Sequence, residues 1–193
     1  MRGNPTKVVL ASESQSRKRA LDILGLTYEI HPSTIGEKSI RDSDPAALTK
    51  KLAEAKARKV ASAFDDAVVL SGDAVVAKHS KIFEKPCSNQ EAVEFLRELF
   101  GSAFLFVTSL TVLRSDTGRM LSAVETSEIK FRRLEDRELH DYIRRYPLLR
   151  CAGAFEGDGV LRFAHSVSGS YNFITAAPVS RLAVFLREQG VEL

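Results

Sequence analysis

The sequence predicts an α/β fold built on a mixed sheet, and three observations support this prediction. Short apolar segments alternate with amphipathic helical segments along the 193 residues. Two long apolar strands, 103–113 and 120–131, flank a turn at 115–118 and indicate an antiparallel hairpin. No Pro/Ser-rich linker divides the chain, so we expect a single domain over residues 1–193.

The individual elements follow from apolar periodicity and from start and stop signals. Pro45 suits the first turn of a helix, Gly25 and Gly101 suit helix ends, and Ser88 with Glu91 forms a capping box. Strands are expected at 7–11, 28–32, 67–76, 82–84, 103–113, 120–131, 160–165 and 171–175. Helices are expected at 17–25, 45–62, 92–100, 134–145 and 178–187.

The composition is that of an ordinary globular protein, with 44% hydrophobic and 27% charged residues. A net charge of +3 suits a small polyanionic ligand and disfavours a role in binding nucleic acid. Cys87 and Cys151 are too few for a disulfide framework, which indicates a reducing compartment. Because no apolar run is long enough for a membrane span, we expect a soluble, cytoplasmic protein that has no membrane partner.

The most informative segment is the apolar strand that contains Ser71, Gly72 and Asp73. A buried carboxylate is costly unless it is paired or binds a cation. We therefore expect Asp73 to end the strand at the mouth of a cleft, where α/β proteins bind ligands. An Asp in a turn that caps a backbone amide is the alternative.

Cationic side chains occur at two suggestive places. Ser12 and Ser14 lie at a strand-to-helix junction that is followed by Arg17, and hydroxyls, helix amides and a guanidinium together form an anion site. An ordinary capped surface helix explains the same residues. Lys56 falls inside the apolar stripe of its helix, so its ammonium group must either extend to solvent or find an anion.

Taken together, these segments resemble the Maf family of nucleoside triphosphate pyrophosphatases from Val8 to about Arg187. No single segment is specific, but their order and spacing are. The matching segments are Leu10-Ala11-Ser12-Glu13-Ser14 with Arg17, then Glu37, Leu52-Ala53-Glu54-Ala55-Lys56-Ala57, Gly72-Asp73 with Val75-Val76, Glu84-Lys85-Pro86, and Ala152-Gly153-Ala154-Phe155.

The resemblance implies a fold and an activity. The family is similar to the inosine triphosphate pyrophosphatases, which implies an elongated mixed sheet in two lobes with a central cleft, often assembled as a homodimer. Its members hydrolyse nucleoside triphosphates to the monophosphate and pyrophosphate with a divalent cation, Mg²⁺ or Mn²⁺. The family was first named for an effect on septum formation.

The resemblance also implies roles for individual side chains. Asp73 is expected to be the general base, Glu37 to share that role, and both to hold the metal. The residues expected to bind the phosphates are Ser12, Ser14, Arg17, Lys56 and Lys85.

Three positions are those that the family uses to choose the base: Ser16, Ala74 and Asp158. The Arg, Thr and Gln of the dTTP/UTP branch are absent there. The segment 151–155 and Asp158 are more similar to the branch that acts on 7-methyl-GTP, although that branch has large residues where this chain has Ser16 and Ala74. A carboxylate accepts hydrogen bonds from the N1–H and amine of guanine, whereas uracil and thymine present carbonyl oxygens.

Other functions stay open at this point. One alternative is a pyrophosphatase for dTTP/UTP or for inosine and xanthosine triphosphates. Another is a nucleotide-binding module without catalysis, which the carboxylates of Asp73 and Glu37 disfavour because a binder of polyanions gains nothing from them. A structural protein linked to cell division has no support beyond the family name.

Overall fold

The computed structural model describes residues 6–146 and 148–193 and contains one seven-stranded sheet. The strand order is β2-β1-β3-β5-β6-β7, with β4 paired to β3. β1 is parallel to β2 and β3, and the other pairs are antiparallel, so the predicted mixed sheet is confirmed. The strands are β1 (Val8–Leu10), β2 (Glu29–Ile30), β3 (Val68–Lys78), β4 (Lys81–Phe83), β5 (Ala103–Arg114), β6 (Met120–Phe131) and β7 (Ala164–Gly169).

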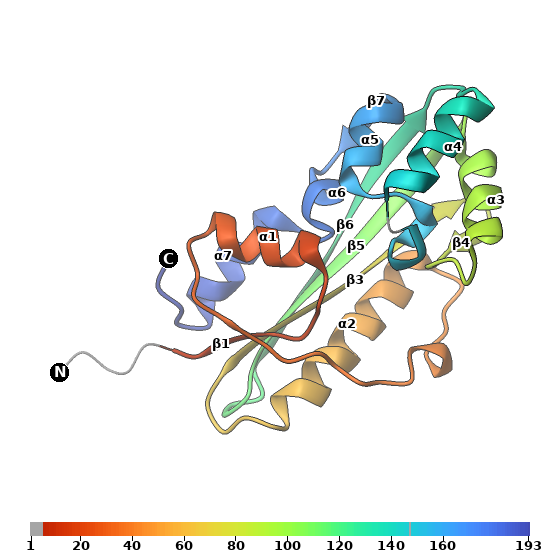
Figure 1. The fold of residues 1–193 in the computed structure, drawn as a ribbon. Helices are drawn as coiled ribbons and strands as arrows, with labels where there is room; N and C mark the ends of the chain where they lie inside the picture. The colour runs from red at the N-terminus through yellow and green to blue at the C-terminus, as the bar shows by residue number, and fades with distance from the viewer. Residues whose placement is uncertain (1–5, 147) are drawn as a thin grey trace.

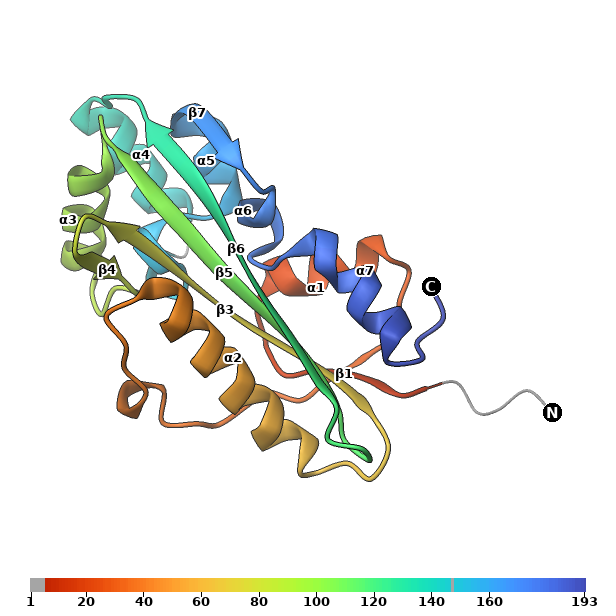
Figure 2. The ribbon, with the colours of Figure 1, turned by 180° about the vertical axis from the view of Figure 1, so that it is seen from behind.

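Helices gather at the two ends of the long strands β3, β5 and β6. α1 and α7 lie at one end, α3 and α4 lie at the other, and α2 runs along the sheet (Figures 1 and 2). The helices are α1 (Gln15–Ile23), α2 (Pro45–Ala61), α3 (Asn89–Leu99), α4 (Asp136–Arg145), α5 (Gly157–Phe163), α6 (Asn172–Thr175) and α7 (Val179–Glu188), and the short 3₁₀ segments are η1 (Glu37–Ser39), η2 (Leu148–Arg150) and η3 (Ala152–Ala154).

The side chains of β3 alternate between two faces of the sheet. Val69 and Val75 pack in the cores beneath α2. On the other face, Leu70 packs against α1 and α7, whereas Val76 packs in the large core formed with α3 and α4. We call these last two clusters the α1/α7 core and the α3/α4 core, and β3 runs from one to the other.

The pairing of β3 changes along its length on the side away from β5. β1 pairs with β3 as far as Leu70, and β4 pairs with it from Val76 onward. Within the described part of the chain, no strand pairs with residues 71–75 on that side. We call this segment the open edge of β3.

Two predicted strands near the C-terminus are wrong. Residues 160–163 belong to the helix α5, with β7 beginning only at Ala164, and residues 172–175 form the short helix α6. Tertiary contacts decide both cases. Asn172 is fully buried, and its side-chain amide donates hydrogen bonds to Thr108 Oγ1 and to the Glu125 carbonyl, both at 2.9 Å. These contacts hold α6 on β5 and β6.

The predicted Ser88 cap of α3 is confirmed. Ser88 caps α3 by accepting a hydrogen bond from Glu91 N at 3.1 Å. Phe104, Phe106 and Phe131 are core residues with 2%, 6% and 0% exposure. No helix among residues 6–146 and 148–193 is long and apolar enough to span a membrane.

The α3/α4 core depends on a cluster of aromatic rings around Phe131. Its ring centroid lies 4.8 Å from that of Phe104 and 5.2 Å from that of Phe155. We expect Phe131→Ala to lower the free energy of unfolding by about 3–5 kcal/mol because it removes a buried ring and leaves a cavity. Urea unfolding would measure this, with Leu161→Ala as the control because Leu161 is 79% exposed. Equal losses in the two variants would contradict the assignment of this core.

Candidate active site

Lys56 joins two carboxylates beside the open edge of β3. Its Nζ lies 2.6 Å from Asp73 Oδ1 and 3.1 Å from Glu37 Oε1. The side chains of Lys56 and Asp73 are only 8% and 13% exposed, whereas Glu37 is 47% exposed. The expectation that Lys56 lies on the buried face of its helix is confirmed, and the anion that it finds is chiefly Asp73.

Two buried serines fix α2, and therefore Lys56, on the sheet. Ser71 Oγ donates a hydrogen bond to the Ala53 carbonyl at 2.6 Å, and Ser109 Oγ donates to the Thr49 carbonyl at 2.7 Å. Both acceptors belong to α2, and the donors belong to β3 and β5. The helix is thus held by polar contacts as well as by apolar packing.

The sequence had suggested that Asp73 ends a strand, and this prediction is wrong. β3 continues without interruption to Lys78. The backbone N–H of Asp73 donates to Ser109 Oγ at 3.2 Å. The carboxylate is tolerated inside a strand because Lys56 compensates its charge and because no strand of the described chain covers this edge. Asp73 is therefore held by the sheet itself and not by a turn.

Arg17 approaches the same segment from α1. Its Nε donates to the Ala176 carbonyl at 3.2 Å, and its Nη1 donates to Ser12 Oγ at 3.1 Å. Burial lowers the pKa of Arg17 below its ordinary value, and the negative charges of Asp73 and Glu37 oppose this effect. Arg17 stays protonated, because a guanidinium is not deprotonated in proteins. It therefore adds a positive charge beside the two carboxylates.

Two groups lie against Gly72 and leave no room for a larger side chain at this position. A Cβ at this position would lie 2.6 Å from the Ser109 carbonyl oxygen and 3.0 Å from Arg17 Nε. The first distance is shorter than non-bonded atoms tolerate, and the first group is backbone that cannot swing away. The glycine therefore lets Arg17 lie against β3.

The serines before α1 do not cap the helix in the expected way. Ser14 occupies the N-cap position, but its side chain makes no capping hydrogen bond. Ser12 Oγ instead accepts from Ser14 N at 3.2 Å and from Arg17, so this hydroxyl orients the arginine. Ser16 is half-buried in the first turn of α1.

Lys85 follows β4 and is exposed. Among the described residues Lys85 makes no ion pair, and therefore it does not pair with Asp73. The neighbouring Glu84 ties two segments together, since its carbonyl accepts from Gly153 N at 3.2 Å and its carboxylate pairs with Arg41 Nη1 at 2.7 Å. No sequence pattern indicated the Arg41–Glu84 pair.

Two of the three positions expected to choose the base lie near the α3/α4 core. Ala74 is partly buried and packs against that core. Asp158 lies in α5, and its side chain is outside the part of the structure that is described. The roles of Ser16, Ala74 and Asp158 in base selection stay predictions.

The residues expected to hold a metal are Glu37 and Asp73, which converge on the ammonium of Lys56. Over residues 6–146 and 148–193, no group of three or more His, Cys, Asp and Glu side chains is placed to hold an ion. Mg²⁺ commonly takes one or two carboxylates together with substrate phosphates and water. The donor set fits a cation whose remaining ligands come from a substrate.

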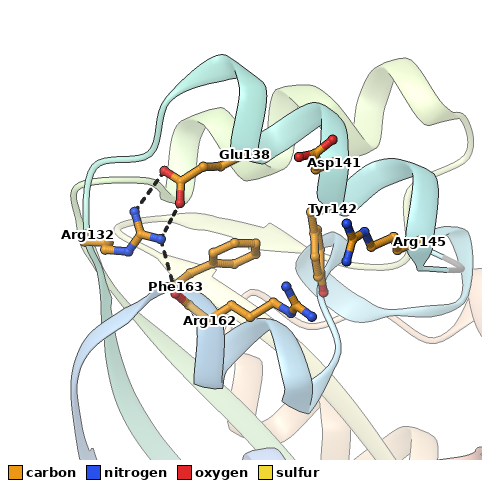
Figure 3. Close-up of a pocket in the computed structure, with 7 residues that line it drawn as sticks. All are labelled: Arg132, Glu138, Asp141, Tyr142, Arg145, Arg162 and Phe163. Atoms are coloured by element: carbon orange, nitrogen blue, oxygen red, sulfur yellow. Dashed lines mark hydrogen bonds and ion pairs between the residues drawn. The ribbon is translucent and has the colours of Figure 1, made fainter.

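A cavity of about 310 Å³ lies between α4 and α5, and none of the predicted site residues lines it (Figure 3). Arg132 and Glu138 pair across one side of it, through contacts of 2.5 and 3.0 Å. Tyr142 points toward α5, and its hydroxyl accepts from Glu156 N at 3.0 Å. Burial raises the pKa of Tyr142, so the phenol stays protonated at neutral pH. The hydrogen bond from Glu156 therefore ties the start of α5 to α4 through Tyr142, which lines the cavity.

Comparison with known proteins places this geometry in a family. The family model described as Maf-like protein matches residues 7–189. The chain belongs to the Maf-like protein family. This Maf-like chain is 32% identical over 188 residues to a 7-methyl-GTP pyrophosphatase of Nitrosococcus oceani, covering 96% of this chain and 94% of that protein. It is 31% identical over 185 residues to a dTTP/UTP pyrophosphatase of Pelotomaculum thermopropionicum, covering 95% and 97%.

A solved structure supports the fold of this Maf-like protein. The HAM1 protein of Coxiella burnetii superposes with a TM-score of 0.50 at 15% identity, covering 95% of this chain and 99% of that one. The predicted mixed α/β fold class is confirmed.

The close approach at Gly72 generates a prediction. We expect Gly72→Ala to lower the free energy of unfolding by about 1–3 kcal/mol and to displace Arg17, because the new methyl group meets the Ser109 carbonyl. Gly36→Ala is the control, since a Cβ there meets only Ser39 Oγ at 3.6 Å. Thermal melts would compare the two, and a harmless Gly72→Ala change would contradict the packing described here.

Cys151 and Cys87 are expected to differ in reactivity. Burial, followed by the nearby Glu156, raises the pKa of the Cys151 thiol to about 12, so it is protonated at pH 8. Cys87 is exposed. Iodoacetamide should therefore label Cys87 at least ~10-fold faster, because the thiolate is the nucleophile. Mass spectrometry of a time course would measure both rates, and similar rates in the folded protein would refute this expectation.

Proposed function

We propose that this Maf-like protein hydrolyses nucleoside triphosphates to the monophosphate and pyrophosphate. The observation that carries the proposal is the largely buried carboxylate of Asp73, which Lys56 holds at 2.6 Å on an open strand edge with Arg17 nearby. A carboxylate beside cations suits the attack of water on a phosphoanhydride. The names of the two relatives, both pyrophosphatases, support the same reaction class.

In the proposed reaction Asp73 is the general base. Lys56 donates a hydrogen bond to Oδ1, and among the described residues no hydrogen bond reaches Oδ2, which can accept a proton from water. The water oxygen forms a bond to the α-phosphorus, the bond from that phosphorus to the bridging oxygen breaks, and pyrophosphate leaves with the electron pair. The fixed position of Asp73 in β3 orients this water.

The triphosphate carries about four negative charges and requires several cations around it. Arg17 is the first candidate, because it makes no ion pair among the described residues and lies next to the open edge. Lys56 adds a second charge, and Ser12 and Ser14 add hydroxyl donors at the start of α1. Lys85 is expected to reach the phosphates from β4.

A divalent cation, Mg²⁺ or Mn²⁺, is part of the proposal. Glu37 and Asp73 would hold it through carboxylate oxygens. When bound, such an ion shields the phosphate charges and polarises the phosphorus.

For the base, we propose a guanine ring, with 7-methyl-GTP as the preferred substrate. Asp158 can accept two hydrogen bonds from the guanine edge, and its negative charge favours the positive charge of the methylated ring. The Arg, Thr and Gln typical of the dTTP/UTP branch are replaced by Ser16, Ala74 and Asp158. Pyrimidine carbonyls would face the carboxylate unfavourably.

The test is pyrophosphate release with Mg²⁺ or Mn²⁺ over a panel that includes 7-methyl-GTP, GTP, dTTP, UTP and ITP. We expect Asp73→Asn to keep the fold and lose at least ~100-fold in turnover, because the amide cannot accept the proton. Asp65→Asn is the control, since Asp65 is exposed on the loop after α2.

Near-normal turnover in Asp73→Asn would remove Asp73 from the mechanism. Tight nucleotide binding without pyrophosphate release by the wild type would identify a binding module instead. Faster turnover of dTTP or UTP than of 7-methyl-GTP would overturn the proposed base preference and leave the reaction class intact.

A further inference from the structure

Ala176 has an unusual backbone conformation for an alanine. It follows α6 with φ 49° and ψ 36°, in the left-handed region that crowds a Cβ against the backbone. Only two other non-glycine residues among those described have positive φ, His79 and Ala154. Such outliers persist where surrounding contacts over-determine them, and they are common at functional sites.

The consequence of this conformation is a contact with Arg17. The Ala176 carbonyl accepts a hydrogen bond from Arg17 Nε at 3.2 Å, across 159 residues of sequence. Ser12 Oγ accepts from Nη1 at 3.1 Å on another side of the same group. Because a guanidinium is planar, two acceptors at different nitrogens fix its orientation. Among the described residues no acceptor contacts Nη2.

The segment that carries Ala176 is anchored to the sheet. Asn172, four residues earlier, is fully buried and bonded to β5 and β6. Thr175 Oγ1 donates to the Ala177 carbonyl at 3.1 Å and so closes the turn around Ala176. The sheet therefore sets the position of the carbonyl, and the arginine adjusts to it.

We propose that Ala176 is the positioning residue for Arg17. Its left-handed conformation directs the carbonyl at Nε, and together with Ser12 this leaves the Nη2 donors for a phosphate group of the substrate. The inference rests on the proposed function, since it assigns Arg17 to the triphosphate. It means that the last connection of the chain, between α6 and α7, completes a site built mainly from N-terminal elements.

The test compares Ala176→Val with Ala176→Gly. A β-branched residue cannot take the left-handed conformation easily, whereas glycine takes it freely. Ala176→Val should raise the KM for the triphosphate about 10-fold with a smaller change in kcat, and Ala176→Gly should leave KM within about twofold. His79→Val and His79→Gly make matched controls at another left-handed position, φ 54° in the β3–β4 turn. They should change thermal stability without changing KM.

A double-mutant cycle separates positioning from a general structural effect. In an Arg17→Met background, which lacks the donor, Ala176→Val should add less than about twofold to the loss of binding. Equal losses in both backgrounds, or no loss in either, would overturn the proposal. If Ala176→Val does not fold, Thr175→Ala loosens the same turn and should weaken binding in the same Arg17-dependent way.

The same cycle is run on the binding of inorganic tripolyphosphate by calorimetry, so that the outcome does not depend on turnover. Arg17-dependent weakening by Ala176→Val, in a protein that hydrolyses no nucleotide, would refute the proposed function and keep the positioning role. Hydrolysis of nucleotides that is insensitive to Ala176→Val would keep the proposed function and refute the positioning role. A wild type that does not bind tripolyphosphate and does not hydrolyse nucleotides would refute both.

Discussion

The buried ammonium group of Lys56 is the constraint on which the rest of the site depends. A lysine on the apolar face of α2 is costly to bury unless a carboxylate meets it. Asp73 does so at 2.6 Å from inside β3, and Glu37 does so at 3.1 Å from η1. This requirement brings a helix, a central strand and a loop to one point, while Ser71 and Ser109 hold the helix in register with the sheet.

The opposite face of β3 meets a different constraint, because two cores share one strand. Leu70 serves the α1/α7 core and Val76 serves the α3/α4 core. The residues between them on that face are Gly72 and Ala74, which have little or no side chain. Space is thus kept at the boundary of the two cores, and Arg17 lies in it. The carboxylate of Asp73 on one face of β3 and the guanidinium of Arg17, which α1 places on the other face, therefore lie at the same edge.

Much of this arrangement could be predicted from local sequence patterns, and the rest could not for physical reasons. The position of Lys56 in an apolar stripe was enough to predict that it lies on the buried face of its helix and must either extend to solvent or find an anion, but it did not decide between the two. Residues 160–163 and 172–175 were misassigned as strands because short segments rich in β-branched and aromatic residues fit either state. Their state is decided by distant contacts such as those of Asn172. A backbone carbonyl such as that of Ala176 carries no sequence signal at all.

The charges at this site favour chemistry over simple binding of an anion. Lys56 is already neutralised by Asp73, so it adds less attraction for a phosphate than an unpaired lysine would. Glu37 lowers the local potential further. The carboxylate of Asp73 compensates the buried ammonium of Lys56, and at the same time it repels a polyanion. Beyond that compensation, it contributes to function by accepting a proton or by holding a cation against the substrate, and both tasks suit hydrolysis.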